Sequence, residues 1–224
     1  MAVIQRHYPL DQVTDEQLRQ AIQILTTEHF NLQTARSATI SEAVGRLSTF
    51  LTAISGVLIA LGFAGQVASF GTTFKVFTLV LLPALLLLGI TTCARVAQTS
   101  MEDIHYLRGI SRIRHFYVEV APEIADYIVG SIHDDAASGM KGMGLEWSWW
   151  QPFLSIVNLI AMVNSIIAGV LAALIIAWTA GPPVGVVVIT GLVVGLVVFG
   201  CHFGIGLRVI GNRERVRQPM FPAS

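Results

Sequence analysis

The sequence predicts an all-α protein that crosses a membrane with four helices. Residues 147–207 contain no Asp, Glu, Lys or Arg, and residues 47–94 contain only Lys75. A helix needs about 20 apolar residues to cross a hydrocarbon core about 30 Å thick. Each stretch is therefore long enough for two crossings. Their continuous apolarity favours helices, because barrel strands alternate polar and apolar side chains.

The composition points to the same class of protein. Hydrophobic residues make up 54% of the chain and charged residues only 12%, whereas soluble domains carry about 25% charged residues. The formal net charge is zero, so we expect no nucleic-acid partner. Cys93 and Cys201 both lie in apolar stretches without the spacing of metal ligands, so we expect two free thiols, no metal and no cofactor.

Four spans account for the two apolar stretches. The predicted spans are Leu47–Phe70, Val76–Ala94, Pro152–Trp178 and Val184–Leu207. A short turn at Gly71–Thr73 separates the first two. Thr179–Pro183 separates the last two, where Gly and paired Pro end a helix. Each span is long enough to cross, and the third is long enough to cross with a tilt.

The basic residues predict the orientation, because Lys and Arg in short loops stay on the cytoplasmic side. Of the 14 basic residues, all but Lys75 lie before the first span, between the second and third, or after the fourth. These are Arg6, Arg19, Arg36, Arg46, Arg95, Arg108, Arg112, Arg114, Lys141, Arg208, Arg213, Arg215 and Arg217. We therefore expect a multi-pass protein of the cell membrane with both termini in the cytoplasm.

Five segments follow from this topology. They are a cytosolic N-terminal helix (1–46), a first transmembrane hairpin (47–94), a cytosolic helical loop (95–151), a second transmembrane hairpin (152–207) and a cytosolic tail (208–224). Trp147, Trp149, Trp150 and Trp178 flank the third span, where aromatic rings favour the membrane interfaces. The external connections are only a few residues long, so recognition or chemistry must take place in the bilayer or the cytosol.

The N-terminal segment has the pattern of one long helix. Thr14 and Gln17 form a capping box, and no Pro or Gly follows until Gly45. We expect a helix that begins at about Asp15 and continues into the first span. An apolar stripe from Leu18 to Leu32, interrupted later by Arg36, needs a partner surface. That surface is either the middle segment or a second copy.

The middle segment reads as two helices separated by Pro122. Glu102–Val120 gathers Tyr and Ile on one face and polar residues on the other, and we place a second helix at Glu123–Ile132. His115 and Glu119, four residues apart, pair with each other or join His133, Asp134 and Asp135 in a metal site. The sequence has no HExxH motif, and the pairing is the simpler interpretation. Arg108, Arg112 and Arg114 are candidates for binding anionic lipid or a phosphorylated ligand.

Small and polar residues in the spans suggest how the helices associate. Close helix packing is predicted at Ala161, Ser165, Gly169 and Ala173 in span three and at Gly191, Gly195, Gly200 and Gly204 in span four. This packing joins spans three and four, or joins copies of the chain. Ser48, Thr52, Ser55 and Gln66 follow one side of span one. They either form hydrogen bonds between helices or line a narrow water path.

Two segments carry a family resemblance. EHFNLQTARSATISEAVGR (28–46) and EDIHYLRGISRIRH (102–115) resemble segments of an uncharacterised family of bacterial four-span integral membrane proteins. The resemblance implies a bacterial inner-membrane setting and supplies no functional residues. The architecture is more loosely similar to small transmembrane effectors of bacterial conflict systems, which combine a few spans with cytosolic helices.

Several function classes are disfavoured by what the spans and loops lack. The sequence has no GxSxG, GxxxxGK[ST] or HExxH motif, so we expect no enzyme. No span carries a charged residue, which disfavours ion-coupled transport. The first hypothesis is a homo-oligomer in the bilayer that forms or gates a small pore, with cytosolic helices as regulatory elements. The second is a non-conducting anchor that docks a cytosolic protein partner.

Overall fold

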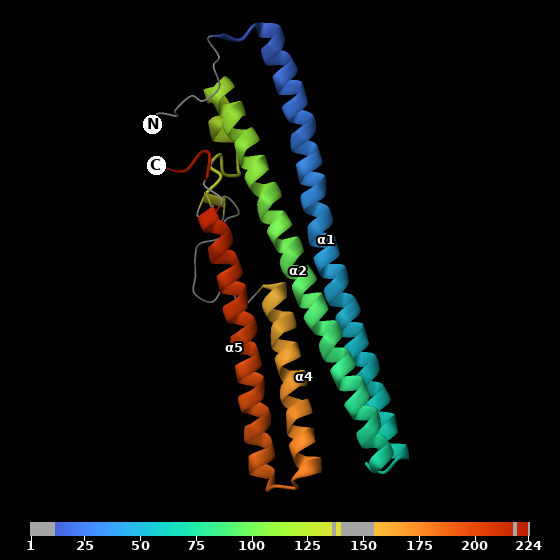
Figure 1. The fold of residues 1–224 in the computed structure, drawn as a ribbon. Coiled ribbons are helices and arrows are strands. Elements are labelled where there is room, and N and C mark those ends of the chain that lie inside the picture. The colour runs from blue at the N-terminus through green and yellow to red at the C-terminus, as the bar shows by residue number, and fades with distance from the viewer. Residues whose placement is uncertain (1–11, 136–137, 140–154, 217–218, 224) are drawn as a thin grey trace. The chain divides into compact units, whose positions relative to one another are not determined.

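The computed structural model describes residues 12–135, 138–139, 155–216 and 219–223. These residues form four long α-helices and one 3-10 helix, with no strand among them (Figure 1). The elements are α1 (Asp15–Val67), α2 (Thr72–Val120), η2 (Pro122–Tyr127), α4 (Ile156–Thr179) and α5 (Val184–Val216). Each α-helix contains a stretch long and apolar enough to cross a membrane. The prediction of an all-helical chain with four long apolar helices is confirmed.

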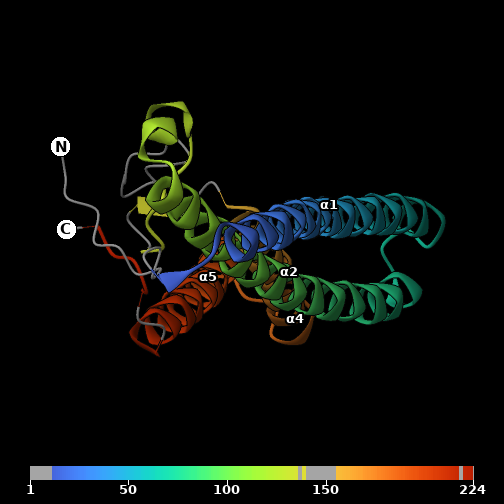
Figure 2. The same ribbon diagram turned by 90° about the horizontal axis from the view of Figure 1, so that it is seen from above.

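The chain divides into two compact units. Unit 1 comprises Met1–Ser41, Ser100–Trp149 and Arg213–Ser224, and unit 2 comprises Glu42–Thr99 and Trp150–Asn212. Both α1 and α2 contribute residues to each unit, and Figures 1 and 2 show these two helices side by side. Each unit has its own set of contacts.

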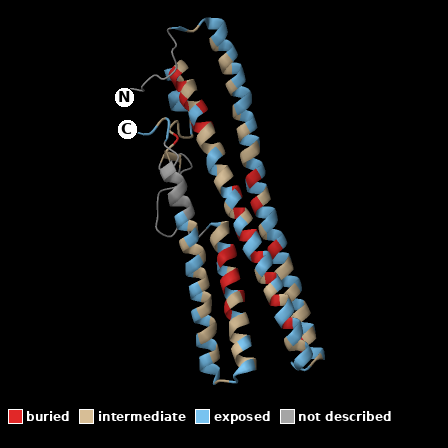
Figure 3. Cartoon of the chain, in the orientation of Figure 1, coloured by how far each residue is buried: buried red, intermediate tan, exposed pale blue. Residues whose placement is uncertain are grey.

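Unit 2 is a helical unit with its core between α1, α2 and α4. Buried side chains from all three helices form one cluster: Ala43, Phe50, Leu82, Leu85, Cys93, Val96, Ile160, Ala161 and Ile167. The residues of α5 whose side chains are described include no buried one (Figure 3). The outward faces of α1 and α5 are apolar, with Leu58 61% and Leu196 71% exposed. A bilayer would solvate such faces as readily as a protein core does.

The two ends of unit 2 differ in chemistry. The turn between α1 and α2 and the turn between α4 and α5 lie at the same end (Figure 1). There the Lys75 ammonium lies 5.8 Å from the centroid of the Trp178 ring, a cation–π geometry. At the other end, Glu42 Oε1 accepts hydrogen bonds from Arg46 Nε at 2.8 Å and Arg95 Nε at 3.0 Å. Apolar helix surface lies between these two polar ends.

The helix boundaries in unit 2 depart slightly from the predicted spans. α1 ends at Val67 rather than Phe70, because Ser69 and Phe70 adopt left-handed backbone angles (φ 46° and 56°) that stop the helix. The Ser155 hydroxyl caps the start of α4 by accepting a hydrogen bond from the Asn158 N–H. Between α4 and α5, Gly181 takes the left-handed conformation (φ 55°) that favours glycine.

In unit 1, residues of α1 before Ser41 pack against residues of α2 after Ser100. Leu32 approaches Gly109 closely enough that a Cβ there would lie 3.0 Å from its Cδ1. The rings of His29 and Tyr117 stack at 6.2 Å, and Arg36 Nε donates to Asp103 Oδ1 at 2.8 Å. The apolar stripe of the N-terminal helix therefore lies against α2, which was one of its two predicted partners.

The two helices predicted in the middle segment have different bounds in the structure. α2 is continuous from Thr72 to Val120, because residues 95–101 contain no Pro or Gly to end the second span. The predicted helix at Glu123–Ile132 is wrong. Only Pro122–Tyr127 is helical, as a 3-10 helix, and Ile128 has an extended backbone. The chain then leaves the helix because residues 131–135 bond to themselves and to the C-terminal segment.

Some predictions fall outside the described residues. These are the tryptophan cluster at Trp147, Trp149 and Trp150, the cations Arg6, Lys141 and Arg217, and the start of the third span at Pro152.

Candidate functional site

The predicted pore-lining residues occupy one exposed edge of α1. Ser48, Thr52, Ser55 and Gln66 are all exposed, and Gly62 lies on the same edge. The Thr52 hydroxyl donates to the Ser48 carbonyl at 2.9 Å and the Ser55 hydroxyl donates to the Leu51 carbonyl at 3.0 Å. Each of these two hydroxyls thus donates its hydrogen bond within α1, and its oxygen can still accept a hydrogen bond from another group. We call this edge the polar edge of α1.

The small residues of α4 and α5 meet inside one chain at three positions. A Cβ built on Gly169 would lie 2.5 Å from the Gly191 carbonyl oxygen, and one on Gly191 would lie 3.1 Å from the Ala173 Cβ. A Cβ on Gly195 would lie 3.2 Å from the Ser165 carbonyl oxygen. Backbone-to-backbone approach of this kind is what small residues permit in membranes.

The other residues predicted for close helix packing have different surroundings. Ala161 is 1% exposed and belongs to the core cluster of unit 2. Nothing lies within 4 Å of a Cβ built on Gly200 or Gly204. That part of α5 is open to a further helix.

The three candidate arginines of the middle segment have different surroundings. Arg112 Nε donates to Asp134 Oδ2 at 2.7 Å, so its charge is matched within the chain. Arg108 is partly buried and is not among the residues that line the pocket between α1 and α2. Arg114 has no hydrogen bond or ion pair with any part of the chain that the structure describes. The anion-binding prediction therefore rests on Arg114.

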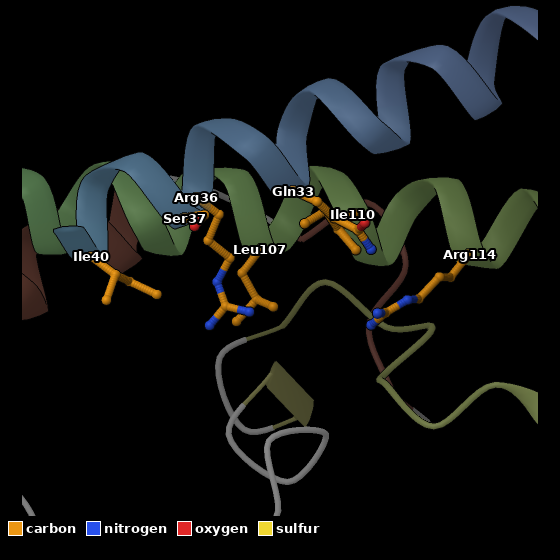
Figure 4. Close-up of a pocket in the computed structure, with 7 residues that line it drawn as sticks. All are labelled: Gln33, Arg36, Ser37, Ile40, Leu107, Ile110 and Arg114. Atoms are coloured by element: carbon orange, nitrogen blue, oxygen red, sulfur yellow. The ribbon is translucent and has the colours of Figure 1, made fainter.

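Arg114 lines a pocket between α1 and α2 with a volume of about 320 Å³. Its lining comprises Gln33, Arg36, Ser37 and Ile40 from α1 and Leu107, Ile110 and Arg114 from α2 (Figure 4). Figure 4 shows Arg36, Leu107 and Arg114 pointing to the same side of the helix pair. We call this site the arginine pocket.

Two guanidinium groups line the arginine pocket, and the Asp103 carboxylate pairs with one of them. Asp103 pairs with Arg36, and both side chains are about three-quarters buried (28% and 23% exposed). Burial, followed by the charge of Arg36, lowers the pKa of Arg114 from its usual value. Asp103 pairs with Arg36 and not with Arg114, so the Arg114 charge has no anionic partner among the described residues.

Gly130 lies against the Arg114 guanidinium. A Cβ built on Gly130 would lie 1.7 Å from Arg114 Nη1 and 2.5 Å from its Cζ. Any other residue at position 130 would push the guanidinium away. The glycine therefore sets where the charge of Arg114 lies.

A second feature of unit 1 is the anchorage of the C-terminal segment on Asp134, whose side chain has no exposed surface. The Asp134 carboxylate accepts hydrogen bonds from the Met220 N–H at 3.0 Å and the Phe221 N–H at 2.8 Å. Asp135 Oδ1 accepts from the Ala223 N–H at 3.1 Å. We call this arrangement the tail clamp.

The predicted His115–Glu119 pair adjoins the tail clamp. Both side chains are buried, with His115 Nε2 3.5 Å from Glu119 Oε1. The His115 ring stacks on Phe221 at 4.1 Å and lies 6.2 Å from His133. Among the described residues, no three His, Cys, Asp or Glu side chains are grouped as metal ligands would be. His115 packs against Phe221 of the C-terminal segment.

Sequence reasoning missed Arg36, Gln33 and Ser37 as pocket residues and missed the tail clamp entirely. Arg36 could have been found, because a charge that interrupts an apolar stripe must face a polar environment. The clamp joins Asp134 to residues 86 and 87 positions later. No local pattern reports such a contact.

No protein-family model, curated protein or solved structure matches this chain. Its function is therefore inferred from its own sequence and geometry.

Proposed function

We propose that this chain is a multi-pass protein of the bacterial inner membrane, with both termini in the cytosol, that self-associates and forms or gates a small pore. The polar edge of α1 carries this proposal. Ser48, Thr52, Ser55 and Gln66 are exposed, in a stretch of α1 that also exposes the large apolar side chains of Leu51, Leu58, Ile59 and Phe63. Hydroxyl and amide groups on a membrane helix gain most when they face another helix or water.

The room beside the polar edge supports close association. Nothing lies within 4 Å of a Cβ built on Gly56 or Gly62. A helix from a second copy could therefore approach the backbone of α1 there. If several copies place this edge around one axis, the Ser, Thr and Gln side chains line the space between them.

The test uses one substitution at two sites. Thr52→Leu replaces a polar-edge hydroxyl with a bulky apolar group, and we expect fewer oligomers and several-fold lower ion flux in liposomes. Thr91→Leu is the matched control, because Thr91 is also an exposed threonine whose hydroxyl donates to its own helix, on α2. A parent protein that is monomeric and passes no ions would rule out the proposal.

A second candidate function is a non-conducting anchor whose cytosolic helices dock a protein partner. The observation that favours it is the organisation of unit 1, which has its own helix packing, a charged pocket and the tail clamp. Crosslinking of unit 1 surfaces in cells separates the two candidates. Recovery of a different protein together with silent liposomes supports the anchor, and recovery of this chain alone argues against it.

A further inference from the structure

We infer that the arginine pocket binds the phosphate group of an amphiphilic phosphate ester, with Arg114 and Arg36 as the anion ligands. The inference concerns unit 1 alone and does not depend on whether the protein conducts ions. Its starting observation is the partly buried Arg114 guanidinium, which has no anionic partner among the described residues.

Arg114 supplies a charge that the described residues leave without an anionic partner. A partly buried guanidinium is normally paired with an anion, because burial of an unpaired charge is costly. Arg114 has no acidic partner in the part of the chain that the structure describes. Placing it beside Arg36 adds repulsion between the two cations. A bound anion would remove both costs.

The donors of the pocket favour phosphate over carboxylate. A guanidinium presents paired N–H groups that match two oxygens of either anion. One arginine alone would occupy both oxygens of a carboxylate. Arg36, Gln33 and Ser37 line the same pocket, and a tetrahedral phosphate has further oxygens for them to reach.

The remaining walls of the pocket indicate that the ligand also has an apolar part. Ile40, Leu107 and Ile110 make up the rest of the lining. Pockets for small molecules combine such apolar walls with a few polar groups that fix orientation. Two sources fit this chemistry, namely the headgroup of an anionic phospholipid and a soluble phosphate ester.

Binding is measured on the full-length protein in neutral detergent, by isothermal titration with two probes. Dihexanoyl phosphatidylglycerol tests the lipid source, and hexyl phosphate tests the soluble source. We expect saturable binding of at least one probe. Arg114→Gln should weaken it at least about tenfold, because the substitution removes both the charge and the paired N–H donors that hold the phosphate. Arg19→Gln is the matched control, because Arg19 is 74% exposed and pairs with Glu16 away from the pocket.

Two further variants keep the test valid if Arg114→Gln misfolds. Gly130→Ala leaves every charge in place but displaces the flexible end of Arg114, so it should weaken binding with little change in melting temperature. Arg114→Lys keeps the charge and loses the paired N–H groups of the guanidinium, so it should bind with intermediate affinity. Three results would overturn the inference: no saturable binding of either probe, parent-like binding by Arg114→Gln, or equal affinity for decanoate.

Discussion

At the scale of single residues, the Asp134 carboxylate joins three segments that are far apart in the sequence. It accepts hydrogen bonds from Arg112 on α2 and from the backbone of Met220 and Phe221. Burial alone would raise the pKa of Asp134. The backbone N–H groups of Met220 and Phe221, and then Arg112, reverse that effect, and the net pKa lies below its usual value.

The substitution Asp134→Asn should release the C-terminal segment. The amide lacks the negative charge that attracts Arg112, and its NH₂ group faces backbone N–H donors. We expect a loss of about 2 kcal/mol, at the lower end for buried charge-assisted bonds because Arg112 is 45% exposed. Hydrogen exchange at the backbone N–H groups of Met220, Phe221 and Ala223 should become faster. Asp126→Asn, an exposed acid in η2, should leave the exchange unchanged.

The lowered pKa of Asp134 also predicts the pH dependence of the tail clamp. A group whose folded pKa is depressed stabilises the fold fully above its unfolded pKa, about 3.9 for Asp. That stabilisation is lost as the pH falls through the lower folded pKa. Tail protection should therefore stay constant from pH 8 to about pH 5 and disappear in stronger acid. Loss of protection between pH 7 and 6 would contradict this account.

In unit 2, Asn164 is a polar residue whose side chain is fully buried. It is 0% exposed, and neither atom of its amide has a hydrogen-bond partner among the described residues. Its Oδ1 occupies the place where a Cβ on Gly89 would lie, only 1.8 Å from that position. The absence of a side chain at residue 89 therefore makes room for the amide.

Gly89→Ala should consequently destabilise unit 2 by about 1–3 kcal/mol, the usual cost of forcing extra atoms into a packed core. Asn164→Ala removes the nearest obstruction but leaves the Phe50 ring, whose Cζ would lie 2.8 Å from the new Cβ. The double variant should therefore recover part of that loss. The measurement is a double-mutant cycle of thermal unfolding in detergent. Gly185→Ala serves as the control, because nothing lies within 4 Å of a Cβ there. Additive effects of the two substitutions would contradict the contact.

At the scale of elements, the sequence predicted helices well and their connections less well. Long apolar stretches and the Thr14–Gln17 capping box located α1 and α4 within a few residues. They also located the start of α5, which continues past the predicted end at Leu207 to Val216. The second span and the middle helix, predicted as two elements, form one continuous helix, because a change from apolar to polar composition does not end a helix. The helix after Pro122 was wrong because tertiary bonds from Asp134 and Asp135 outweigh the local preference.

The arginine pocket shows the same limit. Its charge was predictable, since Arg114 is one of the three arginines that the sequence marks as candidate anion ligands. Its partners were not, because Arg112 and Arg114 are only two residues apart yet face Asp134 and the pocket respectively. Which arginine has an acidic partner depends on a loop about 20 residues further along the chain. Spacing on one helix cannot report that.

The close contact between α4 and α5 gives an element-scale prediction. Gly169→Ala should weaken the hairpin, because the new Cβ would lie 2.5 Å from the backbone oxygen of Gly191 and a backbone cannot rotate away. We expect about 1–3 kcal/mol of destabilisation and a lower melting temperature. Gly200→Ala is the same change at an open position of α5 and should leave the hairpin intact. Equal melting of the two variants would contradict the packing.

At the scale of the whole molecule, surface exposure and charge placement lead to one arrangement. Unit 2 presents apolar helix faces between an end with Lys75 and Trp178 and an end with Glu42, Arg46 and Arg95. The chain enters unit 2 at Glu42, on the arginine side, and both helix turns lie at the other end. The excess of arginines over the single lysine then predicts that the arginine side faces the cytosol.

This orientation can be tested by labelling single cysteines in intact cells with a maleimide that cannot cross the membrane. The background replaces Cys93 and Cys201 with Ser. We expect Thr72→Cys and Pro183→Cys, at the two turns, to react from outside. Gln5→Cys and Met220→Cys should react only after the cells are opened, because residues before the first span and after the fourth share the arginine-rich side. Labelling of residue 5 or 220 from outside would contradict the predicted topology. It would also contradict the proposal that the polar edge of α1 lines a pore through the membrane.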